Sequence, residues 1–238
     1  MGGADPVADY AGVAHKALIE LEGRPLLARV AQALHEAGAA RVGVSCNHPA
    51  VAALARDLGL EVLPAAAGPS QSVFEGAQAL GFPLLVTTAD HALLQPEWVT
   101  RFLDDIPAGT DVAALVAPKT AVEAAAPTTR RTYLKLADGW WSGCNLFWLG
   151  REQALGAVAF WRRLEAERKR PWKMARILGL GMLLKYVTGA LSLSGAARRL
   201  GELAGVEARV VATPYGLAAV DVDKPADLDL VRELTGGR

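Results

Sequence analysis

Cysteine, excess charge and long hydrophobic runs are all scarce in this sequence, and each scarcity excludes some classes of protein. The two cysteines, Cys46 and Cys144, provide neither a disulfide framework nor a metal-ligand spacing, which suits the reducing cytoplasm. Basic and acidic residues balance at 25 each, so we expect no nucleic-acid partner, because that would need a basic excess. The apolar run at residues 177–184 is too short to cross a bilayer.

Apolar residues are plentiful, at 52% of the 238 residues, which is ample for one buried core. We find no internal repeat or linker, so residues 1–238 are predicted to form a single domain. Strands and helices alternate in the first half, which favours parallel strands joined by crossover helices. Strands are expected at residues 41–46, 60–64 and 83–90, and helices at residues 25–37, 49–59, 70–80 and 96–106.

The pattern changes after residue 111. Strands are expected at residues 112–117, 132–136 and 142–149 without helices between them, followed by strands at 208–213 and 216–223 and a helix from Pro225. Residues 151–205 are largely helical in pattern and form an insertion. The predicted fold is therefore a Rossmann-like, three-layer α/β/α domain with a mixed, mostly parallel sheet.

The stretch "LLVTTADHALLQPEWV" places Asp90 at the end of an apolar strand, just before a helix that begins with proline. Ligands of open α/β sheets bind at the carboxyl ends of the strands, so Asp90 is expected in that crevice. A carboxylate there suits Mg²⁺, which takes one or two carboxylates together with phosphate oxygens. The alternative is a loop or helix-capping aspartate without a ligand.

A second strand expected to end in carboxylates is "AAVDVDKPADLDLV". Alternation would put Asp221 and Asp223 on the same side of that strand. Asp223 also suits a helix cap two residues before Pro225, which is the alternative interpretation. Paired with Asp90, one of these carboxylates could share a single metal ion.

Two further stretches suit phosphate binding. In "HKALIELEGRPLLARVAQAL", Lys16 lies just ahead of a short apolar segment, a glycine turn and a helix. In "AGPSQSVFEGAQAL", small residues precede a helix whose free N–H groups could receive a phosphate, ribose or base. The alternative for the second stretch is an ordinary turn, which a bare Gly-Pro-Ser loop more often forms than a site.

The order of these parts resembles the MobA-like NTP transferases, which are relatives of the sugar-phosphate and polyol-phosphate cytidylyltransferases with the GT-A type fold. The resemblance covers most of the chain and is weakest over residues 150–205. It implies that Lys16 neutralises phosphate charge and that Asp90 and Asp223 bind the catalytic metal, Mg²⁺. It also implies that Ser70 and Ser72 approach the nucleoside and that Asn145, in "SGCNLFWL", touches the acceptor.

The amino terminus departs from this family pattern. The family opens with a buried strand that runs into a glycine-rich signature containing an arginine, whereas this chain begins "MGGADPVADYAGVAHK". Gly2 and Gly3 resemble the end of that signature and are expected to bind substrate. We expect the first strand to be missing, either because the start is misassigned or the chain shortened, or because this member of the family is degenerate. A misassigned start is favoured, since loss of the strand would leave two neighbouring strands with unpaired edges.

Residues 161–187 combine basic residues, two tryptophans and an apolar stretch, "ILGLGMLLKYV". One interpretation is peripheral contact with an anionic membrane, where a lipid-linked acceptor would be presented. The alternative is a solvated basic helix followed by a core helix or a homodimer surface.

These observations predict a cytoplasmic, Mg²⁺-dependent nucleotidyltransferase that joins an NMP to a phosphorylated acceptor and releases pyrophosphate. CTP is slightly favoured over GTP, from the likeness to cytidylyltransferases. Both reactants are anionic, so cations and in-line positioning matter more than acid–base groups. Two alternatives stay open: a GT-A glycosyltransferase using Asp221 and Asp223 as an Asp-x-Asp motif, and a non-catalytic nucleotide-binding homologue.

Overall fold

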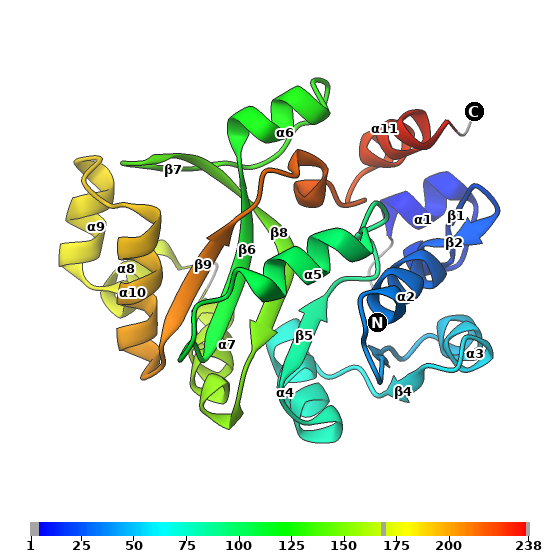
Figure 1. The fold of residues 1–238 in the computed structure, drawn as a ribbon, viewed down its shortest axis with the longest axis horizontal. Helices are drawn as coiled ribbons and strands as arrows, with labels where there is room; N and C mark the ends of the chain where they lie inside the picture. The colour runs from blue at the N-terminus through cyan, green and yellow to red at the C-terminus, as the bar shows by residue number, and fades with distance from the viewer. Residues whose placement is uncertain (1–4, 168–169, 237–238) are drawn as a thin grey trace.

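The computed structural model describes residues 5–167 and 170–236 (Figure 1). The strands are β1 (Glu20–Leu21), β2 (Arg24–Pro25), β3 (Gly43–Ser45), β4 (Glu61–Leu63), β5 (Leu84–Thr87), β6 (Val112–Pro118), β7 (Leu134–Leu136), β8 (Gly139–Leu149) and β9 (Ala208–Ala212). The helices are α1 (Pro6–Ala11), α2 (Leu26–Glu36), α3 (Pro49–Asp57), α4 (Pro69–Leu80), α5 (Pro96–Asp104), α6 (Lys119–Ala125), α7 (Leu155–Glu167), α8 (Pro171–Leu178), α9 (Leu180–Val187), α10 (Leu193–Ala204) and α11 (Pro225–Thr235). Three short 3₁₀ segments, η1 (Lys16–Leu18), η2 (Glu152–Ala154) and η3 (Gly216–Ala219), complete the elements.

The main sheet has the strand order β5-β8-β6-β9, with β7 also paired to β8. Strand β8 is antiparallel to the three strands it pairs with, β5, β6 and β7, whereas β6 and β9 are parallel. A separate parallel pair is formed by β3 and β4. Within the described residues, β3 pairs only with β4, and β5 pairs only with β8.

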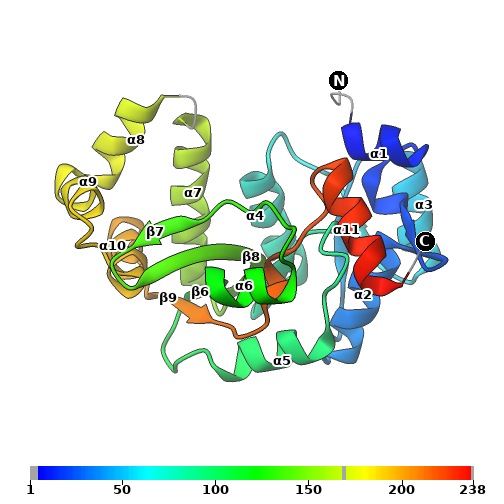
Figure 2. The same ribbon diagram turned by 90° about the horizontal axis from the view of Figure 1, so that it is seen from above.

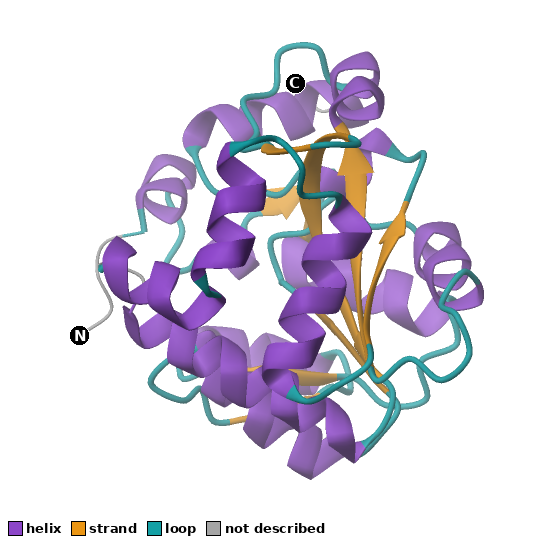
Figure 3. Ribbon diagram, turned by 90° about the vertical axis from the view of Figure 1, so that its left-hand side faces the viewer, coloured by secondary structure: helices purple, strands orange, loops and turns teal. Residues whose placement is uncertain are grey.

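Helices cover both faces of the main sheet, as Figures 2 and 3 show. On one face α4 and α7 pack together over a cluster that includes Ala77, Val158 and Leu149. On the other, α2 and α5 contribute Leu26, Phe102 and neighbours to the largest hydrophobic cluster. The three-layer α/β/α architecture with a mixed sheet is thus confirmed, and α7–α10 confirm the helical character of the insertion.

Three local predictions were wrong. Residues 216–223 do not form a strand: the 3₁₀ segment η3 is followed by an extended segment whose Val222 N–H donates to the Asp90 carbonyl. Helix α6 lies between β6 and β7, where no helix was expected. Helix α1 was also missed, although Asp5 caps it through the amides of Val7 and Ala8. No described helix is long and apolar enough to cross a membrane.

Candidate functional site

Lys16 joins the two aspartates that the sequence singled out. Its Nζ donates to Asp90 Oδ2 at 2.5 Å and lies 3.5 Å from Asp223 Oδ1. The three side chains come from three separate segments: the start of η1, the turn after β5 and the turn before α11. The structure therefore brings the predicted cation and the two predicted metal ligands together.

Backbone contacts hold these segments in place. The Val222 N–H donates to the Asp90 carbonyl at 3.1 Å, which ties the two carboxylate-bearing turns to each other. Asp227 accepts from the backbone amides of Asp223 and Lys224, at 3.2 and 2.9 Å. Asp227 therefore supplies the side-chain cap at the start of α11, which leaves the Asp223 carboxylate for Lys16.

The charged groups in this cluster shift one another's pKa values. Burial acts to lower the pKa of Lys16, but the charge and hydrogen bond of Asp90, together with Asp223, raise it above its ordinary value. Partial burial and the negative charges of Asp221 and Asp90 raise the pKa of Asp223, in spite of Lys16. Asp223 thus sits in a field that favours an additional positive charge.

Asp90 is the buried member of the cluster. Its side chain is 8% exposed, compared with 58% for Asp223. Within the described ranges, Asp90 Oδ1 is buried without a hydrogen-bond partner. Next to it, His91 is fully buried and burial lowers its pKa to about 4, so the imidazole is neutral at neutral pH. His91 therefore adds no charge to the cluster.

Asp221 belongs to a second cluster that sequence reasoning did not assemble. Its carboxylate accepts hydrogen bonds from Arg131 Nη1 and Asn145 Nδ2. Asp221 and Asp223 were expected on one side of a strand, but there is no strand, and they bind different cations. Because Arg131 and Asn145 engage Asp221, an Asp-x-Asp pair acting on one metal is disfavoured.

A distorted stretch of β8 presents Asn145. The register between β6 and β8 shifts so that one β6 residue, Leu115, faces residues 144–146 of β8. Asn145 lies inside this bulge with a φ of 48°, a left-handed conformation that asparagine tolerates better than most residues. The bulge turns its side chain toward Asp221. The sequence hinted at Asn145 only through the family resemblance.

The two serines in the first turn of α4 form hydrogen bonds within the protein. Ser70 is buried, and its hydroxyl donates to Glu165 Oε2 of α7 at 2.5 Å. Ser72 Oγ accepts from the Ala66 amide at 3.0 Å. In the described part of the chain, neither serine bonds to Lys16, Asp90 or Asp223, so their contact with a nucleoside stays a prediction.

His15, the residue before Lys16, lies against His48, and neither histidine was predicted as part of the site. The His15 and His48 ring centroids lie 5.5 Å apart, and His15 Nδ1 accepts from the Ala17 amide. Burial, and then the charge of His48, lower the pKa of His15. Gly2 and Gly3, the predicted substrate-binding glycines, lie outside the described residues.

The donor set around Lys16 fits a metal whose other ligands come from substrate. Within the described ranges, no three His, Cys, Asp or Glu side chains gather to hold a metal ion. Two carboxylates do converge, and Mg²⁺ typically takes one or two carboxylates plus phosphate oxygens and water. The unpartnered, buried Asp90 Oδ1 offers a lone pair to such a cation.

Comparisons with known proteins identify the family to which this fold belongs. The family model of the MobA-like NTP transferase domain matches residues 10–168. The chain belongs to the MobA-like NTP transferase family. A 3-deoxy-manno-octulosonate cytidylyltransferase from Chlorobium luteolum is 33% identical over 121 residues, which are 46% of this chain and 48% of that protein. The chain thus matches about half the length of this curated relative.

Several solved structures are similar to this chain in fold. A hypothetical transferase from Thermus thermophilus is 36% identical, with a TM-score of 0.82 over 95% of this chain and 96% of its own. A CMP:2-keto-3-deoxy-manno-octonic acid synthetase complexed with CTP has a TM-score of 0.58 at 20% identity, covering 93% and 91%. A 2-C-methyl-D-erythritol 4-phosphate cytidylyltransferase, also from Thermus thermophilus, has a TM-score of 0.56 at 18% identity, covering 93% and 94%. The last two support the fold alone.

Proposed function

We propose that this protein is a Mg²⁺-dependent nucleotidyltransferase. An oxygen of a phosphorylated acceptor attacks the α-phosphorus of an NTP, the bond from that phosphorus to the β-phosphate oxygen breaks, and pyrophosphate leaves. The observation that carries the proposal is the Lys16 ammonium held between Asp90 and Asp223 at the ends of two segments. A reaction between two anions needs such fixed charges more than it needs a general base.

The three side chains divide two tasks between them. Lys16 is positioned to donate to phosphate oxygens, because its ammonium is fixed by two carboxylates rather than free to rotate into solvent. Asp90 and Asp223 would hold Mg²⁺, which when bound neutralises phosphate charge. The ion pairs explain why both carboxylates stay close together before a nucleotide arrives.

CTP is the proposed nucleotide and a phosphorylated small molecule or lipid-linked alcohol the proposed acceptor. Support for CTP comes from the relatives, since one is a cytidylyltransferase and one solved neighbour was complexed with CTP. The acceptor side would lie near Asn145 and Arg131, because Arg131 supplies a cation within the second cluster.

The test is pyrophosphate release with each of the four NTPs against a panel of phosphorylated alcohols and sugars. We expect CTP to give the highest turnover and added Mg²⁺ to be required. Release with no NTP and acceptor combination would overturn the proposal, and a preference for another NTP would overturn its CTP part. Activity that persists unchanged with a chelator present would overturn the metal part.

Asp90→Asn is the decisive variant. It keeps the shape of the side chain but removes the buried charge, so turnover should fall by about a thousandfold or more. Asp105→Asn is the matched control, because Asp105 is an exposed carboxylate paired only with Arg101 at the end of α5. Thermal unfolding should show both variants folded, and a folded Asp90→Asn variant with wild-type turnover would refute the assignment.

A further inference from the structure

Helices α8 and α9 expose an apolar surface at the far end of the molecule from the Lys16 cluster. In Figure 1 they lie at the left edge, opposite α1 and α11, and in Figure 3 that side of the molecule faces the viewer. Helix α9 has no buried residue. The most exposed large apolar side chains are Leu180 (78%), Val187 (74%), Trp172 (70%) and Leu184 (64%).

This exposure contradicts the alternative that the apolar stretch is a core helix. Only Met182 of α9 packs against a hydrophobic cluster, the small one around Leu136 and Leu191. A helix that is apolar on nearly all sides is normally buried in a protein core or in lipid. An exposed apolar patch on a folded protein marks a surface that another body covers.

Positive charge predominates around this patch. Between residues 170 and 201 the sequence has no Asp or Glu, but it has Arg170, Lys173, Arg176, Lys185, Arg198 and Arg199. Glu167 pairs with Arg170 and Lys173, and Glu202 pairs with the two arginines of α10. In the described part of the chain, Arg176 and Lys185 form no ion pair. Two positive charges therefore stand uncompensated on the same two helices.

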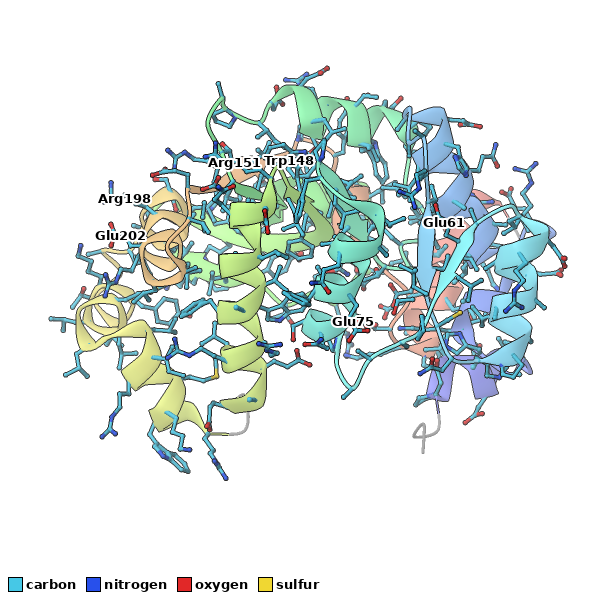
Figure 4. All side chains as sticks on the ribbon, turned by 90° about the horizontal axis from the view of Figure 1, so that it is seen from below. Glu61, Glu75, Trp148, Arg151, Arg198 and Glu202 are labelled. Carbon is cyan, nitrogen blue, oxygen red and sulfur yellow. The ribbon has the colours of Figure 1, made fainter. Side chains whose placement is uncertain are left out.

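A cavity of about 450 Å³ lies between α9 and α10, next to the apolar patch. Its lining includes Lys185, Arg198 and Arg199, with Glu202 as the one carboxylate among the described lining residues. Figure 4 shows Arg198 and Glu202 side by side on α10. Three cations against one carboxylate suit an anionic group of phosphate size.

We propose that α8, α9 and the α9–α10 cavity form a docking surface for an anionic phospholipid membrane. The apolar side chains would enter the boundary between headgroups and acyl chains, and the cavity would take a lipid phosphate. A second copy of the chain fits less well, because a two-fold interface would place this basic surface against itself. The proposal concerns binding only and does not depend on nucleotide transfer.

The test is co-sedimentation of the full chain with vesicles. Phosphatidylcholine vesicles containing about one third phosphatidylglycerol should pellet the protein at low salt, and high salt should weaken binding by screening. Pure phosphatidylcholine should pellet much less. Equal pelleting with both vesicles, or none with either, would overturn the proposal.

Matched variants locate the surface. Leu184→Gln should lower the partition coefficient about tenfold, and Lys185→Gln about fivefold. The controls lie at exposed positions at the end of α3 and should change nothing: Leu58→Gln makes the same substitution as Leu184→Gln, and Arg56→Gln removes one positive charge as Lys185→Gln does. Equal effects of the α9 variants and the controls would overturn the proposal. So would a wild-type dimer in sedimentation velocity that Leu184→Gln converts to monomer, because a second copy would then cover the patch.

Discussion

The two ends of the molecule differ in how their charged side chains are buried and paired. At the end that carries Lys16, charged groups are buried or half-buried and each has an opposite partner: Lys16 with Asp90, and Arg131 with Asp221. At the end that carries α8 and α9, Lys173 pairs with Glu167, but Arg176 and Lys185 are exposed and form no ion pair within the described residues, and large apolar side chains lie on the same helices. Figure 2 shows the two ends separated by the sheet and by α4 and α7.

The difference follows from what surrounds each end. A charge removed from water must be compensated by a partner, so burial of Asp90 and Asp221 demands Lys16, Arg131 and Asn145 at fixed positions. An exposed cation needs no partner, so α8 and α9 impose no such geometry. Replacing a charged side chain should therefore lower stability at the Lys16 end and leave it nearly unchanged at the α9 end.

Removing the partner of a buried charge should produce the largest effect. Arg131→Met keeps much of the side-chain volume but leaves the buried Asp221 with Asn145 alone. We expect the free energy of unfolding to fall by about 3–5 kcal/mol, measured by urea denaturation. Arg176→Met on α8 is the matched control and should cause no measurable loss.

The double variant Arg131→Met with Asp221→Asn sharpens this comparison. It removes both charges, so it should be more stable than Arg131→Met alone. If Arg131→Met lowers the free energy of unfolding by less than about 1 kcal/mol, Arg131 and Asp221 do not form the buried, mutually compensating ion pair that their geometry indicates.

The next effect concerns pH. Burial raises the pKa of Cys144 to about 12, from an ordinary value of 9.0. Above pH 9 the unfolded chain loses this proton while the folded chain keeps it, so stability should fall as pH rises from 9 toward 12. At pH 10.5 the loss should reach about 2 kcal/mol relative to pH 8.

Urea denaturation of the wild type and of Cys144→Ala at the two pH values checks this expectation. The variant has no thiol at this position, so its stability should fall less between them. Iodoacetamide at pH 8 should label half-exposed Cys46 in the folded protein and spare Cys144. Rapid labelling of folded Cys144 would show that the thiol is not buried.

The sequence predicted those parts of the fold that depend on local patterning. The strand before Asp90 and the helix after Pro225 were predicted because an apolar run and a proline each act within a few residues. Residues 216–223 were misassigned because alternation alone does not show whether a neighbouring strand exists to pair with. Here the segment bonds to the Asp90 backbone instead of joining the sheet.

The sequence predicted the carboxylates and the lysine of the site, but it did not predict the second cluster around Asp221. Arg131 lies in irregular structure between α6 and β7 and is 90 residues from Asp221, so no local signal links the two. The bulge that turns Asn145 is a property of the pairing between β6 and β8, which alternation within β8 does not contain. The exposure of α9 likewise depends on what the rest of the chain leaves uncovered.

The smallest expected effect separates backbone strain from side-chain bonding at Asn145. Asn145→Gly and Asn145→Ala both remove the hydrogen bond to Asp221, but only alanine is strained at a φ of 48°. Asn145→Ala should therefore be less stable than Asn145→Gly by about 1 kcal/mol in urea denaturation. Gly189, at a φ of 70° between α9 and α10, provides the comparison at the other end, since Gly189→Ala should cost a similar amount. The backbone cost is then common to both ends, whereas the loss of a buried hydrogen bond arises at Asn145 and not at Gly189. If Asn145→Ala is instead more stable than Asn145→Gly, the bulge is not strained.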